Sequence, residues 1–183
     1  DGVVNIISGH GDPCGKVLTS HPKVARVSFT GGPVSARHVI QNSAENFAEV
    51  SLELGGKSPF IVFADADIES AVNGSVGGIF ASTGQSCVAG SRLLLQEDIA
   101  DGFIEKLVAV AKTVKIGDPM LDETEMGPLC TKGQQDHIKR EVAHAITEGA
   151  TIRAGGAVPV GLEGIFFEPT IVDCPSHDLR IVD

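Results

Sequence analysis

One cysteine of the sequence lies where a thiol could act as a nucleophile. Cys87 belongs to residues 83–92, which read TGQSCVAGSR and lie between a predicted helix and a predicted strand. Small neighbours leave such a thiol accessible, and the backbone amides of a glycine-bounded turn can point at a developing oxyanion. The alternative is an inert thiol, the usual state of a scattered cysteine in a chain of this size. The residues alone leave both interpretations open.

One carboxylate lies where a general base could act. Glu53 comes near the end of the apolar segment 49–54, and Gly55-Gly56 follows it. Folds with alternating strands and helices bind their ligands at the carboxyl ends of the strands, so a carboxylate there is a candidate base. The alternative is an exposed carboxylate at a sheet edge, with no chemical role.

Two further patterns carry weaker signals. The glycines at 9, 11 and 15 follow an apolar run roughly as in a dinucleotide fingerprint, but the last spacing is one residue too long and no acidic residue stands at the ribose position. They indicate a turn with a weak hint of a cofactor. His137, Glu141 and His144 share one helix face, which we interpret as solvated because the opposite face is apolar and carries Ile138, Val142 and Ile146.

Composition excludes several classes of function. The chain has 183 residues and a formal net charge of −10, and it lacks Tyr and Trp, which argues against a nucleic-acid partner. No apolar run is long enough to cross a bilayer, and the first residues are neither basic nor a long apolar leader. The four cysteines form no Cys-x-x-Cys pair and have no histidine at a zinc-like spacing. We therefore expect a cytoplasmic protein without membrane contact or metal.

The elements that must position these residues alternate along the chain. Apolar runs predict strands, and amphipathic segments predict helices, with Asp67 as an N-cap. This alternation is typical of an α/β fold with parallel sheets and flanking helices. We place a domain boundary at Gly55-Gly56, giving domains 1–54 and 55–183. The predicted strands cover 3–7, 24–29, 49–54, 59–63 and 91–96, and the predicted helices cover the region of 17–18, 35–44, 68–82, 99–114 and 134–147.

Several blocks, taken together and in order, resemble the aldehyde dehydrogenase superfamily. The glutamate block LELGGKSP at 52–59 and the cysteine block, GQSC at 84–87 with AGSR at 89–92, are the most specific. The resemblance extends over essentially the whole chain. Further blocks are SFTGG at 28–32, KIGDP at 115–119, MGPL at 126–129 and FEPT at 167–170.

The resemblance implies a fold and a chemistry. Residues 1–54 would be the C-terminal part of a Rossmann-like NAD(P)-binding domain, and 55–183 the N-terminal and central part of the catalytic domain. Cys87 would attack an aldehyde to give a thiohemiacetal, and its amide would supply one oxyanion donor. Hydride transfer to NAD or NADP would leave a thioester, and Glu53 would activate the water that hydrolyses it.

The resemblance also implies a cofactor site. Gly31, Gly32 and Leu54 would lie against the cofactor, and Gly9 would lie near its adenosine half. The family usually has Ser at the position of Gly32 and often Gly at that of Ala36, so we expect an altered cofactor loop.

The chain has well under half the usual length of the family. The upstream asparagine of the oxyanion hole and a cofactor-binding lysine have no counterpart in it, so we expect little or no activity from this polypeptide alone. The parent enzyme would be a homodimer or homotetramer acting on a small-molecule aldehyde that the sequence does not name. The rivals are a non-catalytic module of the same fold and a relative that passes the acyl group to coenzyme A, which Glu53 argues against.

Overall fold

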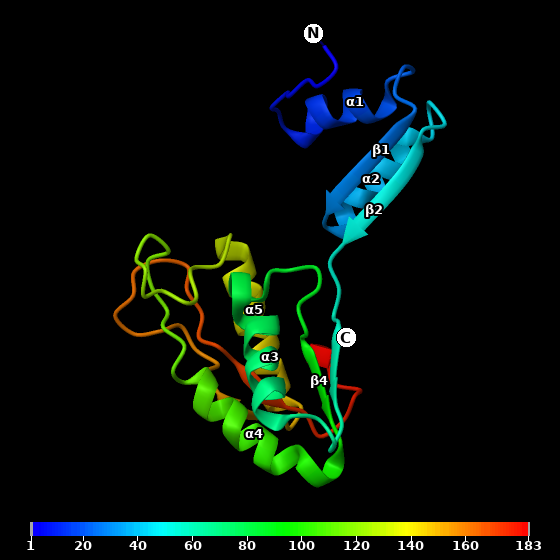
Figure 1. Cartoon of the computed structure of the whole chain (residues 1–183). Helices are drawn as coiled ribbons and strands as arrows, with labels where there is room; N and C mark the ends of the chain where they lie inside the picture. Colours follow the sequence, from blue (N-terminus) through cyan, green and yellow to red (C-terminus); the bar gives the residue numbers. More distant parts are fainter. Residues whose placement is uncertain (1, 183) are drawn as a thin grey trace. The chain divides into compact units, whose positions relative to one another are not determined.

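The computed structural model describes residues 2–182 and divides into two compact units (Figure 1). Unit 1 is Asp1–Gly56 and unit 2 is Lys57–Asp183. Within the described residues, no helix is long and apolar enough to cross a membrane.

Unit 1 is built around two parallel strands joined by a helix. Strand β1 (Arg26–Gly31) pairs in parallel with β2 (Glu49–Leu54), and α2 (Pro33–Ser43) connects them across one face of the pair (Figure 1). Pro33 begins α2. Its ring fixes φ near the helical value, and its missing N–H costs nothing because an N–H in the first turn has no partner within the helix. The buried positions of α2 recur at helical spacing and are Ala36, Val39 and Ser43.

The first apolar run of the chain is not a strand. Residues 3–7 were predicted to form one, but they are irregular, and Val3 and Ile6 are 93% and 91% exposed. A strand requires a neighbour that completes its ladder of hydrogen bonds, and residues 2–182 offer this segment none. The short helix predicted near 17–18 is present as α1 (Lys16–Ser20), preceded by the irregular turn η1 (Gly11–Gly15).

Unit 2 contains a second parallel pair and a separate antiparallel pair. Strand β3 (Pro59–Val62) pairs with β4 (Arg92–Leu95), and α3 (Ile68–Phe80) lies between them in sequence. Strand β5 (Thr151–Ala154) pairs with β6 (Ile171–Asp173) in antiparallel fashion. The remaining elements are η2 (Ala81–Gly84), α4 (Glu97–Ala111), α5 (Lys132–Thr147) and η3 (Arg180–Val182).

The main core of unit 2 lies between the β3–β4 pair and helices α3 and α4. Its centre is Val62, Val72, Phe103 and Leu107, and Phe103 is only 1% exposed. Both helices bury one stripe at helical spacing, as predicted. Asp67 caps α3 by accepting a hydrogen bond of 2.8 Å from the Ser70 N–H, and its hydrogen bonds with Ser70 hold the pKa of the Asp67 carboxyl below its usual value.

Helix α5 is rotated slightly from the predicted orientation. The prediction placed Ile138, Val142 and Ile146 in the core, but Ile146 is 53% exposed and Ala145 is buried in its place. The buried residues 135, 142 and 145 and the half-buried Ile138 follow steps of three and four residues, which is the spacing of one helix face. Residue 146 lies about 100° further round, outside the buried stripe.

Gly155 is a position where the fold of unit 2 requires glycine. Its φ is +62°, and a Cβ there would overlap the carbonyl oxygen of Pro169. We expect Gly155→Ala to lower the free energy of unfolding by about 2–4 kcal/mol, because a left-handed backbone and an overpacked contact both disfavour alanine. Gly149→Ala is the matched control, since Gly149 has φ +93° with nothing within 4 Å of a Cβ. Urea denaturation that gave equal losses for the two variants would contradict the steric argument.

Candidate functional site

Cys87 lies on an exposed loop between α3 and β4. Helix α3 ends at Phe80, two residues before its predicted end, because Ser82 and Thr83 adopt left-handed backbone angles, with φ of 52° and 55°. Gly84 continues this left-handed run, with φ +70°. The side chain of Cys87 is exposed, as the sequence predicted for a thiol in this turn.

The far end of the loop is anchored by backbone hydrogen bonds. The Gly90 N–H donates to the carbonyl of Gly78 in α3 at 3.1 Å, and the Arg92 N–H donates to the carbonyl of Ser58 at 3.2 Å. The loop therefore begins at the end of α3 and ends at the amino end of β4, where Arg92 is bonded to the residue just before β3. A rigid support of this kind lets a loop hold a reactive group in place.

The backbone at Cys87 leaves a donor free. The N–H of Val88 donates to the Ser86 hydroxyl at 3.4 Å, and the N–H of Ala89 donates to the Ser86 carbonyl at 3.2 Å. Within the described part of the chain, the Cys87 N–H makes no hydrogen bond. An N–H next to a nucleophile, with no internal partner, is suited to bind an oxyanion that forms on attack.

Gln85 is a residue that the sequence analysis did not single out. Its side-chain oxygen accepts a hydrogen bond of 3.0 Å from the N–H of Cys130, 45 positions further along the chain. Its amide nitrogen lies within hydrogen-bond distance of the Ser82 carbonyl, at 3.4 Å, and of the Thr83 hydroxyl. The available signal was its place two residues before Cys87 in the same sequence block.

The other cysteines differ from Cys87 in exposure. Cys130 is exposed, whereas Cys14 and Cys174 are half-buried. Burial raises the pKa of the Cys174 thiol, and the neighbouring Asp173 and Glu148 carboxylates raise it further. The thiolate is the reactive form, so Cys174 is a poor nucleophile near neutral pH.

We expect iodoacetamide to alkylate Cys87 at least about fivefold faster than any other cysteine of the chain, because its thiol is exposed in a loop of small residues that leave it open to the reagent. Mass spectrometry of tryptic peptides over a time course measures the four rates in one sample. Cys130 is the internal control, since it is also exposed but follows the buried Leu129 instead of lying in a loop of small residues. Equal rates at Cys87 and Cys130 would favour an inert module.

Unit 1 carries the carboxylate candidate at the carboxyl end of its parallel pair. Glu53 is opposite Thr30 in the register, and Leu54 is opposite Gly31. Side chains alternate between the two faces of a strand, so Glu53 and Thr30 share the face that carries Arg26 and Ser51. The Glu53 side chain is exposed on this polar face.

Three of the predicted cofactor residues lie together in unit 1. Gly31 and Leu54 are paired across β1 and β2, and Gly32 follows directly as the N-cap of α2. A Cβ at Gly31 would lie 2.6 Å from the tip of the Phe29 ring, so a larger residue there would displace that ring. A Cβ at Gly32 would meet nothing within 4 Å, so the Ser that the family resemblance places there would fit.

The remaining two positions of the cofactor prediction lie in the same unit. Gly9 is in the exposed segment before η1, where a Cβ would lie 2.7 Å from the Cys14 sulfur. Ala36 is 2% exposed, and its N–H donates to the Gly32 carbonyl at 3.0 Å in the first turn of α2. The amino terminus of α2 follows Gly31 and Gly32, and backbone N–H groups at such a helix end can donate hydrogen bonds to a phosphate.

One histidine of the predicted polar face of α5 lies beside a carboxylate. His137 Nδ1 is 3.5 Å from the Glu141 carboxylate, which also accepts a hydrogen bond of 2.7 Å from Arg180. Among the described residues, no group of three or more His, Cys, Asp and Glu side chains could hold a metal ion. The predicted solvated face is wrong at Glu141, whose side chain is only 14% exposed beneath Arg180, whereas His137 and His144 are exposed.

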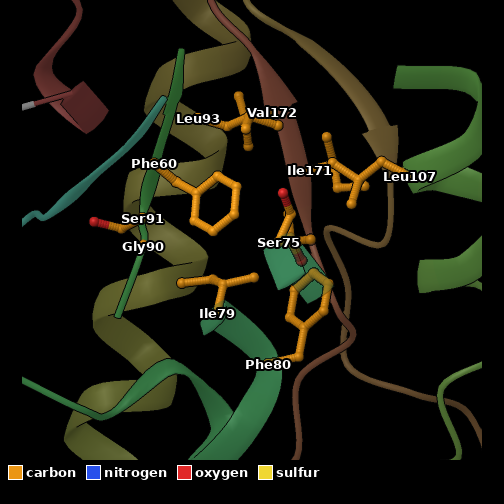
Figure 2. Close-up of a pocket in the computed structure, with 11 residues that line it drawn as sticks. Phe60, Ser75, Ile79, Phe80, Gly90, Ser91, Leu93, Leu107, Ile171 and Val172 are labelled. Atoms are coloured by element: carbon orange, nitrogen blue, oxygen red, sulfur yellow. The ribbon is translucent and has the colours of Figure 1, made fainter. Parts of the chain in front are cut away.

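A cavity of about 130 Å³ lies in unit 2 beside the end of the Cys87 loop (Figure 2). Gly90 and Ser91 line it, and Figure 2 shows the Phe60 ring extending into the space bounded by Ile79 and Leu93. The hydroxyl of Ser75, which also lines it, donates to the Ala71 carbonyl at 2.8 Å. The lining is mostly apolar core, so the cavity offers no chemistry of its own.

The folded segments and their motifs define a member of a known family of enzymes. The protein-family model described as "Aldehyde dehydrogenase family" matches residues 1–183, and the chain belongs to this family. A (Z)-2-((N-methylformamido)methylene)-5-hydroxybutyrolactone dehydrogenase of Acinetobacter baylyi is 55% identical over 173 residues, which are 94% of this chain and 35% of that protein. Betaine aldehyde dehydrogenase 1 of Oryza sativa is 45% identical, over 98% of this chain and 36% of that protein.

Solved structures show the same relationship. Betaine aldehyde dehydrogenase from Staphylococcus aureus in complex with NAD+ is 40% identical, with a TM-score of 0.91 over 97% of this chain and 36% of that chain. An aldehyde dehydrogenase mutant from Bacillus cereus is 40% identical, with a TM-score of 0.89 over 95% of this chain and 35% of that chain. The predicted α/β fold class is confirmed. The chain spans about a third of the length of the relatives that it matches.

Proposed function

We propose that this chain supplies the nucleophile and the general base of an NAD(P)-dependent aldehyde dehydrogenase, which oxidises a small-molecule aldehyde to a carboxylic acid. The observation that carries the proposal is the family match over residues 1–183, which includes the blocks of both Cys87 and Glu53. In this proposal, residues 1–54 belong to the NAD(P)-binding domain and residues 55–183 to the catalytic domain.

Cys87 begins the reaction as a thiolate. Its sulfur forms a bond to the aldehyde carbon, and the carbonyl oxygen becomes an oxyanion to which the Cys87 N–H donates a hydrogen bond. The nicotinamide cofactor accepts the hydride that leaves this carbon. The carbon–oxygen double bond forms again, and the acyl group remains on Cys87 as a thioester.

Glu53 completes the reaction as a general base. Its carboxylate takes a proton from water, and the resulting hydroxide equivalent attacks the thioester carbon. The carbon–sulfur bond breaks, which releases the carboxylic acid and restores the Cys87 thiolate. The exposure of Glu53 in unit 1 supports this role, since a base that activates water needs contact with solvent.

The backbone of unit 1 suits a dinucleotide. Gly31 and Gly32 lead into the amino terminus of α2, where free N–H groups and the helix dipole favour a pyrophosphate. Leu54, opposite Gly31, would contact the cofactor, and Gly9 would lie near its adenosine half. The NAD+ bound to the Staphylococcus aureus relative supports NAD as the first cofactor to test, followed by NADP.

A chimera tests the proposal, because this chain spans only about a third of its relatives. In the chimera, this chain replaces the aligned segment of the Acinetobacter baylyi dehydrogenase, whose own substrate is then used. We expect NADH formation and free acid as product. A folded chimera that made no NADH, or one that produced an acyl-CoA from added coenzyme A in place of the acid, would contradict the proposal.

We expect the 183-residue chain by itself to form NADH at less than about a thousandth of the chimera's rate, because catalysis depends on groups held together in one site. The measurement is aldehyde-dependent absorbance at 340 nm with purified chain and chimera at equal concentration. NADH production by the purified chain that disappeared in its Cys87→Ala variant would show that this expectation is wrong.

A further inference from the structure

The loop that carries Cys87 adopts a backbone that its own residues do not favour. Ser82 and Thr83 are left-handed without being glycine, and such residues cost free energy that other contacts must offset. The loop therefore needs contacts that hold it in this shape. The backbone bond from Gly90 to Gly78 supports only its far end.

Gln85 provides the contact at the near end. Its amide nitrogen reaches back to Ser82 and Thr83, which are the strained residues, and its side-chain oxygen accepts from the Cys130 N–H at 3.0 Å. One side chain thus connects the strained turn to a segment 45 positions away. Cys87 is only two residues beyond this connection.

The partner segment is firmly held. Leu129 is buried and packs with Val142 and Phe167, and its N–H donates to the Ile165 carbonyl at 2.9 Å. The Cys130 N–H, one residue on, is therefore presented from a fixed point of unit 2. A hydrogen bond to such a point restricts the loop far more than one between two mobile loops.

We propose that Gln85 is a positioning residue that holds the Cys87 loop against the Leu129–Cys130 segment, so that the Cys87 N–H faces the oxyanion during acyl transfer. This inference rests on the proposed function, since it assumes that Cys87 accepts an acyl group. Gln85 touches neither the acyl group nor the cofactor and acts through the loop.

Two reactions of the same thiol separate positioning from exposure. Acylation of Cys87 by 4-nitrophenyl acetate forms an S–C bond at a carbonyl, generates an oxyanion and releases 4-nitrophenolate, so it depends on the placement of backbone donors. Alkylation by iodoacetamide displaces iodide at a saturated carbon and forms no oxyanion. Loss of positioning should slow the first reaction selectively.

The experiment uses the 183-residue chain. For Gln85→Ala we expect Cys87 acylation to slow roughly tenfold, while alkylation changes less than about twofold. Gln85→Met, which keeps the length but lacks the amide, should behave like Gln85→Ala. Gln85→Glu retains an oxygen that accepts from the Cys130 N–H, so it should restore most of the ratio of acylation to alkylation. Circular dichroism checks that each variant is folded.

Gln96 is the matched control. Its side-chain oxygen accepts from the Ala64 N–H at 2.9 Å, which is the same kind of bond in the same unit but outside the Cys87 loop. Gln96→Ala should leave both rates unchanged. Parallel loss of the two rates in Gln85→Ala, or unchanged acylation, overturns the inference. A wild-type chain that is alkylated but never acylated at Cys87 overturns the positioning role, whereas the proposed function is overturned only by a folded chimera that forms no NADH.

Discussion

Replacing Cys87 by alanine in the chimera is expected to abolish aldehyde oxidation, lowering kcat by at least about 10⁴-fold, because removal of a covalent nucleophile leaves no alternative path to the thioester. The residual rate is measured as NADH formation at saturating aldehyde. Binding of NAD+, measured by fluorescence or calorimetry, should change little, since unit 1 supplies the proposed cofactor contacts. This combination separates loss of chemistry from loss of folding.

Cys130→Ala is the matched control for this substitution. Cys130 is also exposed and lies in the same unit, and its contact with Gln85 uses the backbone N–H, which alanine keeps. Its kcat should remain within about twofold of the parent chimera, as expected for a surface change away from the chemistry. Substantial NADH formation by the Cys87→Ala chimera would show that Cys87 is not the nucleophile.

Glu53→Gln should separate the two halves of the reaction. Without the base, hydride transfer can proceed but thioester hydrolysis slows, so we expect a burst of about one NADH per active site followed by turnover reduced about 10²–10⁴-fold. Stopped-flow absorbance at 340 nm measures the burst, and mass spectrometry of the quenched protein detects the acyl group on Cys87.

Glu49→Gln controls for the charge that Glu53→Gln removes. Glu49 lies on the same strand and the same face as Glu53, four residues earlier. It is exposed, and its carboxylate lies 3.6 Å from the Arg26 guanidinium. Its removal should leave both burst and turnover near the parent values. Unchanged steady-state turnover in Glu53→Gln would exclude its role as base, and a lost burst would assign it to the first half of the reaction.

Local sequence patterns determined most of the helices and the parallel strands. The buried residues of α3 and α4 recur at helical spacing. Asp67 predicted the start of α3, where its side chain accepts a hydrogen bond from the Ser70 N–H, three positions away. These features depend on neighbours within one or two turns, so the sequence alone carries them. The exposed thiol of Cys87 in a glycine-bounded loop was predicted for the same reason.

The tertiary structure decided the features that depend on distant partners. Residues 3–7 are apolar enough for a strand but have no paired neighbour within residues 2–182, and the exposure of Ile146 depends on which face of α5 meets the core. The sequence predicted both β1 and β2, but only their register sets Glu53 opposite Thr30 and Leu54 opposite Gly31.

The cysteine loop shows the same division between local and distant effects. The sequence predicted Cys87 as the candidate nucleophile, because the small residues and glycines around its thiol can be recognised without a structure. The left-handed angles of Ser82 and Thr83 run against local preference, and Gln85, which contacts both residues, also accepts a hydrogen bond from the Cys130 N–H. A hydrogen bond across 45 positions forms only once the chain has folded, so no local pattern encodes it.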